Sequence, residues 1–395
     1  MLHKSIPGIV GILALCSVFP VHADSVDDYL RTELERKRVP GLAVVVTRSG
    51  KIVKVAGYGY ANLEHQVPVK PGTVFQSGSI SKQVAAAVAM LLVEDGKIVL
   101  DDPVKKYLPD APSAWDRITI RHLLMHTSGI PEYEYGKDFD MRKDYTDDER
   151  LRIVYGMKLE FAPGSRWNYS DTGYMVLGIL LSRAGGEFYG DILRRRVFEP
   201  LGMKTAQIIS EEDVIPNRAS GYRLVRDEIK NQKFVSPSNY KTADGSLCWS
   251  VLDMAKWTDA GRTQALLKPD SWREMTTAVR LTSGRAYPYG FGWFIDEWNG
   301  KPVLQQGGNS PRQDRSRHHD HLRARACTQR KTDRGQGAGD DRASSELPRP
   351  RRGRQVKRVG FYFLTGWISP RAGGQVRRAS RASRRIEIPC SAGAP

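Results

Sequence analysis

Residues 77–96, "SGSISKQVAAAVAMLLVEDG", decide the fold. Ser79 and Lys82 lie three residues apart, just before residues 84–93, which are apolar on every face of a helix. A helix that is apolar all round is buried in the protein, and this run is well short of the roughly 18 residues that a membrane span needs. Residues three apart share a helix face. The stretch therefore predicts a central buried helix whose first turn carries a hydroxyl and an amine side by side.

The serine and the lysine at the start of this helix have the chemistry of an acyl-transfer nucleophile. A serine hydroxyl is weakly nucleophilic until a base takes its proton, and a lysine can be that base where its surroundings favour the neutral amine. The N-terminal end of a buried helix adds backbone N–H groups that stabilise developing negative charge. The same spacing recurs at Ser238 and Lys241 in "SPSNYKTADG" without a following apolar helix. We interpret that second pair as part of a polar loop, so the first pair needs companion motifs.

Companion motifs occur at residues 161–178, "FAPGSRWNYSDTGYMVLG", where a Pro-Gly turn precedes Tyr169 and Asp171. Further matching stretches are "GYGYANLEHQVPVKPGTVFQSGSISK", "LDDPVKKYLPD", "ITIRHLLMHTSGIPEY" and "YGFGWFID". With these motifs in order, the chain resembles the serine β-lactamase and penicillin-binding-protein-like family. That family includes class C β-lactamases, D-Ala-D-Ala carboxypeptidases, D-aminopeptidases and β-lactamase-like carboxylesterases. The resemblance runs from about Asp27 to Pro311.

The resemblance implies a role for each catalytic position. Ser79 would be the acylated nucleophile, Lys82 its proton acceptor or the group that tunes it, and Tyr169 a proton shuttle to the leaving group. Asp171 stands where the family usually has asparagine. A carboxylate there would hold the ammonium of Lys82 charged and oppose its use as a base. His126 in "HTSG" is expected to belong to a structural turn.

The third motif of the family is altered in this chain. Gln306, Gly307 and Gly308 take the place of His-Gly-Gly, with Gln305 as the other possible register. A neutral glutamine can donate a hydrogen bond to a carbonyl but cannot pair with a carboxylate as a lysine does. We predict Asp171 and the Gln-Gly-Gly segment as substrate-binding residues. Esters or uncharged amides are favoured over penicillins and over peptides with a free carboxyl terminus.

Periodicity along the rest of the chain predicts an α/β (α+β) protein, an antiparallel sheet flanked by helices with a mostly helical insertion lobe. Residues 41–61 have the pattern of a β-hairpin, and residues 287–308 return to strand character. The sequence from about 101 to 217 is mostly helical. The early and late strands are therefore expected to build one sheet lobe that the helices interrupt.

Two terminal segments differ from the domain between them. Residues 1–23 have a basic start, an apolar stretch and a Val-His-Ala end, which is the form of a cleaved secretory signal. We assign residues 24–311 to a β-lactamase-like serine hydrolase domain and residues 312–395 to an anomalous tail. The family continues after this point into closing strands and a helix, which the tail lacks. We interpret the tail as an out-of-frame reading of the gene, with a genuine basic tail as the alternative.

The basic charge of the chain belongs to this tail. The formal net charge is +17, and residues 312–395 hold 21 Lys and Arg against 7 Asp and Glu, which leaves 40 against 37 elsewhere. Only 11 of these 84 residues are Leu, Ile, Val or Phe. Such a composition cannot offset ordering entropy by burial, so we expect the tail to be disordered. A specific nucleic-acid binder is therefore not predicted, although a genuine tail could contact anionic envelope polymers or nucleic acid.

The predicted function is that of an exported serine hydrolase, periplasmic or secreted, which forms an acyl-enzyme with an ester, β-lactam or peptide substrate. It would be a monomer without a transmembrane segment or a cofactor, and loss of the closing strands would impair it. No metal-ligand spacing occurs before residue 311, and "RHHDHLR", residues 317–323, is not predicted to bind metal. The alternative is an inactive degenerate member, or an envelope-binding protein that uses its basic tail.

Overall fold

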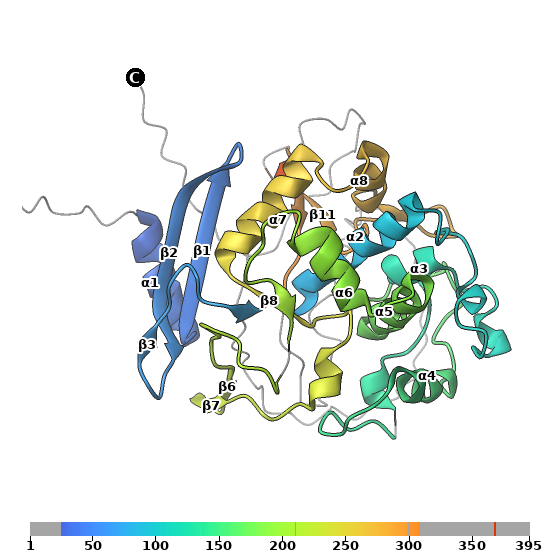
Figure 1. Ribbon diagram of the computed structural model, residues 1–395, viewed down its shortest axis with the longest axis horizontal. Coiled ribbons are helices and arrows are strands. Elements are labelled where there is room, and N and C mark those ends of the chain that lie inside the picture. Colours follow the sequence, from blue (N-terminus) through green and yellow to red (C-terminus); the bar gives the residue numbers. More distant parts are fainter. Residues whose placement is uncertain (1–24, 137, 210, 299–300, 309–366, 369–395) are drawn as a thin grey trace, which may run out of the picture.

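The computed structural model describes residues 25–136, 138–209, 211–298, 301–308 and 367–368 (Figure 1). The helices are α1 (Ser25–Lys37), α2 (Ser81–Glu94), α3 (Ile120–Leu124), α4 (Asp147–Tyr155), α5 (Asp171–Gly185), α6 (Tyr189–Leu193), α7 (Val251–Thr263) and α8 (Pro269–Met275). Within the described ranges, none of them combines the length and the apolar character that crossing a bilayer requires.

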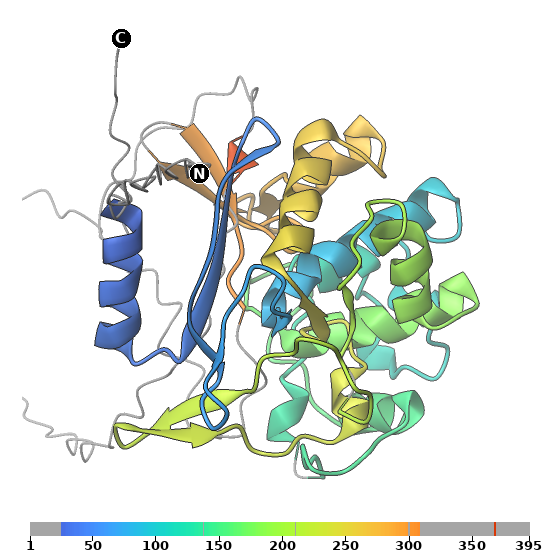
Figure 2. The same cartoon turned by 60° about the vertical axis from the view of Figure 1, so that its left-hand side comes forward.

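The first sheet is the predicted hairpin. Strands β1 (Gly41–Arg48) and β2 (Lys51–Asn62) pair antiparallel, and β3 (Val67–Pro68) adds to β2. The turn between β1 and β2 consists of Ser49 and Gly50, with φ of 50° and 81°. Two successive left-handed residues form the tight turn whose twist matches that of the strands. Helix α1 lies along this sheet (Figure 2).

The remaining strands are short and form separate ladders. They are β4 (Phe75–Gln76), β5 (Gln207–Ile208), β6 (Tyr222–Val225), β7 (Glu228–Asn231), β8 (Leu247–Trp249), β9 (Val279–Arg280), β10 (Ala286–Tyr287), β11 (Phe294–Trp298), β12 (Lys301–Gln305) and β13 (Trp367–Ile368). The sheet orders are β4-β8-β5, β6-β7, β10-β9 and β11-β12-β13, and all pairs are antiparallel.

This arrangement confirms the predicted fold class of helices with antiparallel sheets. The early and late strands do not share a ladder among the described residues, however, since β1 pairs with β2 and β12 pairs with β11 and β13. Helix α7 packs against β1 and lies between the hairpin and the helical part of the molecule (Figure 1). Apart from the β13 backbone, the tail from residue 312 lies outside the described residues, as does the predicted signal segment.

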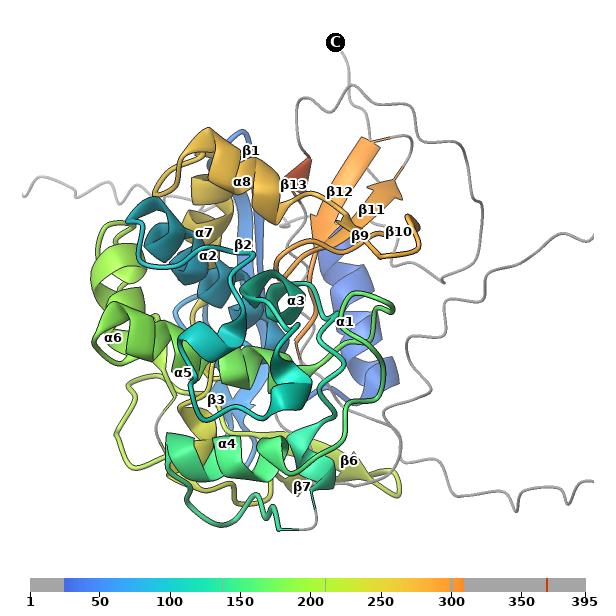
Figure 3. The ribbon, with the colours of Figure 1, turned by 90° about the vertical axis from the view of Figure 1, so that its right-hand side faces the viewer.

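Helix α2 forms the centre of the molecule, as its sequence predicts. Its residues from Ser81 to Leu92 are all buried. Helices α5, α6 and α8 pack around it (Figure 3). The indole of Trp257 in α7 donates to Gln83 Oε1 at 2.9 Å. A helix covered on every side is held in place by its neighbours, so the groups at its N-terminal end are positioned rigidly.

Candidate active site

The predicted serine and lysine meet at the N-terminal end of α2. Gly78 has a φ of 51°, in the left-handed region that favours glycine, and it begins the short helix η1 (Gly78–Ile80) that carries Ser79. The ammonium of Lys82 donates a hydrogen bond of 3.2 Å to Ser79 Oγ. Ser79 is half-buried, whereas Lys82 is 0% exposed. The hydroxyl can therefore be reached while its partner is shielded from water.

Two aspartates complete the surroundings of this lysine. Lys82 Nζ lies 2.6 Å from Asp171 Oδ1 and also donates to the backbone carbonyl of Asp244. Asp171 is the first residue of α5, and Asp244 lies in the loop before β8. The three groups around Nζ occupy the three donor positions of a primary ammonium.

The N-terminal end of α5 is held by a half-buried glutamate. Glu132 accepts from the backbone N–H of Asp171 at 3.0 Å, from that of Thr172 at 3.1 Å and from the Thr172 hydroxyl at 3.0 Å. Ser170 caps the same helix by accepting from Gly173 N at 2.9 Å. These bonds satisfy N–H groups that a helix leaves free at its first turn. They fix the position of Asp171 and, through it, that of Lys82.

Tyr169 lies over the lysine within an aromatic cluster. Lys82 Nζ is 5.1 Å from the centroid of the Tyr169 ring, within the range of a cation–π contact. The His126 ring packs on Tyr169 with centroids 4.3 Å apart, and its Nε2 is 2.9 Å from the hydroxyl of Tyr289. His126 Nδ1 accepts from the backbone N–H of Ser170 at 3.0 Å. Both ring nitrogens are occupied, so His126 has the predicted structural role and positions Tyr169.

The second glycine of the third motif, Gly308, packs against the backbone beside the nucleophile. A Cβ on Gly308 would lie 2.0 Å from the carbonyl oxygen of Ser77 and 3.1 Å from Ser79 N, which only glycine permits. A Cβ on Gly307 would meet no atom within 4 Å. Gln306 follows directly after β12, is 4% exposed, and donates through Nε2 to Gly307 O at 3.0 Å. Of the two possible registers, the structure therefore buries Gln306, whereas the side chain of Gln305 donates to Asp296 at 3.0 Å.

The charges around Lys82 keep its ammonium protonated. Burial by itself lowers the pKa of Lys82, but the carboxylate of Asp171, with Tyr169 and Asp244, outweighs burial and leaves this pKa above its usual value. Burial also raises the pKa of Tyr169 to about 12, against the opposing effect of the neighbouring ammonium. At neutral pH both Lys82 and Tyr169 are thus protonated, and for Lys82 this is the effect expected of an aspartate at position 171.

Comparison with known proteins settles the family. The model of the family described as beta-lactamase matches residues 26–321, which is more than half of the chain. The chain belongs to the beta-lactamase family. Its relatives include a penicillin-binding protein and a D-aminopeptidase, and the members of this family are serine hydrolases. The resemblance predicted from the motifs is therefore confirmed.

Curated relatives align with this chain over only part of their length. A penicillin-binding protein of Bacillus subtilis is 28% identical over 282 residues, which cover 67% of this chain and 62% of that protein. A D-aminopeptidase of Gluconobacter oxydans is 29% identical over 279 residues, or 68% of this chain and 51% of the relative. The chain thus spans between half and two thirds of the length of these relatives.

Solved structures of a penicillin-binding protein homologue and of an amidase have the same fold. The octameric penicillin-binding protein homologue from Pyrococcus abyssi aligns with a TM-score of 0.63 and 27% identity, over 72% of this chain and 67% of that one. The D-amino acid amidase from Ochrobactrum anthropi aligns with a TM-score of 0.63 over 72% of this chain and 84% of that one. At 24% identity, this second likeness shows the fold alone.

Among the predicted site residues, the structure brings together Ser79, Lys82, Tyr169 and Asp171, and it places Gly308 against the nucleophile. The sequence prediction missed Asp244, although it lies in the polar stretch "SPSNYKTADG" that was assigned to a loop. It also missed Glu132, which follows directly after the "HTSGIP" segment. The described residues contain no cluster that could hold a metal ion, and residues 317–323 lie outside them.

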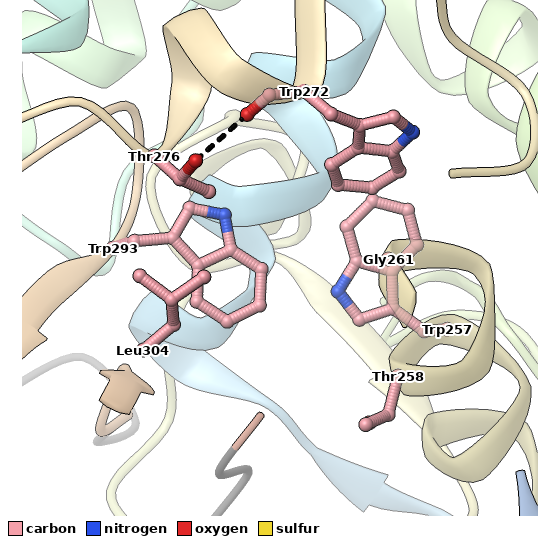
Figure 4. A pocket seen from close by; sticks show the side chains of 7 residues that line it. All are labelled: Trp257, Thr258, Gly261, Trp272, Thr276, Trp293 and Leu304. Carbon is pink, nitrogen blue, oxygen red and sulfur yellow. Dashed lines mark hydrogen bonds between the residues drawn. The ribbon is translucent and has the colours of Figure 1, made fainter. Parts of the chain in front are cut away.

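A separate apolar pocket lies beside the late strands (Figure 4). It is lined by Leu304 of β12 and by three tryptophans, Trp257, Trp272 and Trp293. The rings of Trp257 and Trp272 have centroids 5.8 Å apart. The lining has two threonine hydroxyls, Thr258 and Thr276, but no acid or base, and it does not include Ser79, Lys82 or Tyr169.

Proposed function

We propose that this chain is a serine hydrolase that acts on an ester or amide through an acyl-enzyme at Ser79. The hydrogen bond of 3.2 Å between Lys82 Nζ and Ser79 Oγ, at the N-terminal end of a buried helix, carries the proposal. Ser79 Oγ attacks the substrate carbonyl, the bond to the leaving group breaks, and the proton of the hydroxyl passes to the leaving group. Water then attacks the acyl ester and releases the acid, which restores Ser79.

The proton leaves Ser79 through Lys82 or Tyr169. Both groups lie beside the hydroxyl, and both are protonated in the resting state, so turnover requires one of them to lose its proton first. The Ser79 backbone N–H, at the positive end of α2, supports the oxyanion. Export by a cleaved signal at residues 1–23, with action in the periplasm or outside the cell, belongs to the same proposal.

The substrate class is proposed from the third motif. Gln306 stands where a cation would bind a carboxylate, so esters and amides without a free carboxylate are the better substrates. The names of two relatives, a D-aminopeptidase and a penicillin-binding protein, agree with an amide or β-lactam as the kind of group attacked. Turnover of 4-nitrophenyl butyrate and of a chromogenic cephalosporin by the full chain tests the proposal. Ester turnover that Ser79→Ala abolishes supports it, whereas equal ester turnover by Ser79→Ala contradicts it.

A further inference from the structure

Strand β12, which leads into the third motif, pairs along both of its edges. Its partner on one edge is β11, and its partner on the other is β13, a piece of the tail. In this antiparallel ladder Val303 lies opposite Ile368, and Leu304 lies opposite Trp367. The backbone of β13 also lies against helix α7. The tail therefore returns to the domain and contacts it at the strand that precedes Gln306.

The two elements that β13 contacts also line the apolar pocket. Trp257 and Gly261 come from α7, and Leu304 comes from β12 (Figure 4). Leu304 is the residue opposite position 367 in the ladder, and residues directly opposite each other share a face of a sheet. The face of β12 at this register is thus apolar and turned toward α7. A strand that extends β13 along this edge meets an apolar surface.

A second strand edge faces β13 from the other side. Strand β1 pairs with β2 along one edge and has no ladder partner along its other edge among the described residues. β13 lies between this hairpin and β12 (Figure 2, Figure 3). The hairpin also exposes apolar side chains, among them Val46, Val53 and Val55. An open edge with exposed apolar side chains is a template for a further strand.

One stretch of the tail has the composition of a buried strand. Residues 359–368, "VGFYFLTGWI", hold 5 of the 11 Leu, Ile, Val and Phe residues in the tail and all 4 of its Phe, Tyr and Trp residues. A short apolar run rich in aromatic side chains is typical of a strand that is covered on both faces. β13 forms the C-terminal end of this stretch.

We propose that residues 359–368 form one strand that lies between β12 and β1 and joins their two sheets into one. The register at β13, continued along the segment, places Thr365 opposite Gln306 and Phe363 opposite Gly308. The strand thus pairs with the third motif and holds it beside the nucleophile. A two-stranded ladder such as β11-β12 is marginal alone, whereas a sheet of several strands with an apolar face is stable. For this segment the proposal replaces the expectation of a disordered tail.

Proline substitution tests this strand in the full-length chain. In a strand with partners on both edges, a proline removes a ladder hydrogen bond wherever it stands. Leu364→Pro should therefore raise amide hydrogen exchange, measured by mass spectrometry, at least about tenfold in peptides that cover residues 41–48 and 301–308. Leu347→Pro, the same substitution outside the segment, should leave both peptides unchanged. Exchange in α2 reports whether the chain is still folded, and Phe363→Ser is a second variant if Leu364→Pro is not.

The outcomes decide between the possible partners of these edges. Equal exchange in Leu364→Pro and Leu347→Pro overturns the proposal, and so does faster exchange in β12 without a change in β1. A wild-type dimer whose β12 protection disappears on dilution assigns the edge to a second copy and also contradicts it. Lower ester turnover in Leu364→Pro with unchanged exchange in α2 supports the pairing with the third motif. The exchange results do not require turnover, so this inference and the proposed function fail separately.

Discussion

The charge on Lys82 decides how Ser79 can be activated. Asp171 lies 2.6 Å from its ammonium, and this contact outweighs the burial that would otherwise favour a neutral amine. The pKa of Tyr169 is raised to about 12. We expect kcat/KM for a neutral ester to rise about tenfold per pH unit from pH 7 to 9, since the active form has lost one proton. A pH–rate profile measured with 4-nitrophenyl butyrate checks this, and a plateau below pH 8 would contradict it.

Replacing the carboxylate at position 171 should let Lys82 lose its proton at a lower pH. Asp171→Asn keeps the size and a carbonyl oxygen for Lys82 but removes the negative charge, so the pKa of Lys82 should fall. We expect kcat/KM at pH 7 to increase by about tenfold and the rising limb of the profile to move to lower pH. The pH–rate profile of the wild-type chain is the control for the pH at which activity rises. An unchanged limb would show that Lys82 does not control the proton.

At the scale of elements, the junction between α5 and the Glu132 segment positions the site. Glu132 accepts hydrogen bonds from the backbone N–H groups of Asp171 and Thr172, and among the described contacts it is their only acceptor. Glu132→Ala would leave buried donors unpaired and should lower the free energy of unfolding by about 1–3 kcal/mol. Urea denaturation measures this. Glu149→Ala, at an exposed capping box of α4, is a matched control with a smaller expected loss.

The approach of the third motif to α2 makes a second prediction at this scale. Gly308→Ala places a methyl group 2.0 Å from the Ser77 carbonyl, so the end of β12 must move away from Ser79. We expect ester turnover to fall by at least about tenfold, because a displacement of about 1 Å at a reacting site has effects of this size. Gly307→Ala meets no atom within 4 Å and is the matched control. Equal activity of the two variants would exclude a role for this contact.

For the whole molecule, two half-buried glutamates couple stability to pH. Burial, together with the Asp171 carboxylate, raises the pKa of Glu132 and of Glu134 to about 8. Both are protonated in the folded chain below that pH and ionised in the unfolded chain above about 4.5, so stability falls as pH rises toward 8. His126, with a lowered pKa, acts in the opposite direction only below about 6.5.

We therefore expect the free energy of unfolding to decrease between pH 6.5 and 8 and to level off above it. Each group contributes a slope of up to about 1.4 kcal/mol per pH unit in this range. Urea denaturation at half-unit intervals measures the slope, and Glu134→Gln should reduce it by about half. Stability that increases between pH 6.5 and 8 would show that these carboxyl groups are ionised in the folded chain.

The sequence predicts the central helix, the hairpin and the nucleophile pair because each depends on local patterns. Helix α2 is apolar on all faces, and Ser49-Gly50 is a turn signal. Strands such as β4 and β5 are too short for any periodicity to show, so the β4-β8-β5 sheet was not predicted. Asp244 reaches Lys82 through its backbone carbonyl across 162 residues, and no side-chain pattern records such a contact.

One measurement tests the central claim most directly. The purified full-length chain is treated with a fluorophosphonate, and its intact mass is compared with that of the treated Ser79→Ala variant. We predict a single adduct on the wild-type chain and none on the variant, because Lys82 and α2 activate only Ser79 among the described serines. An adduct of equal yield on both chains, or none on a wild-type chain that melts cooperatively, would contradict the assignment of Ser79 as the nucleophile.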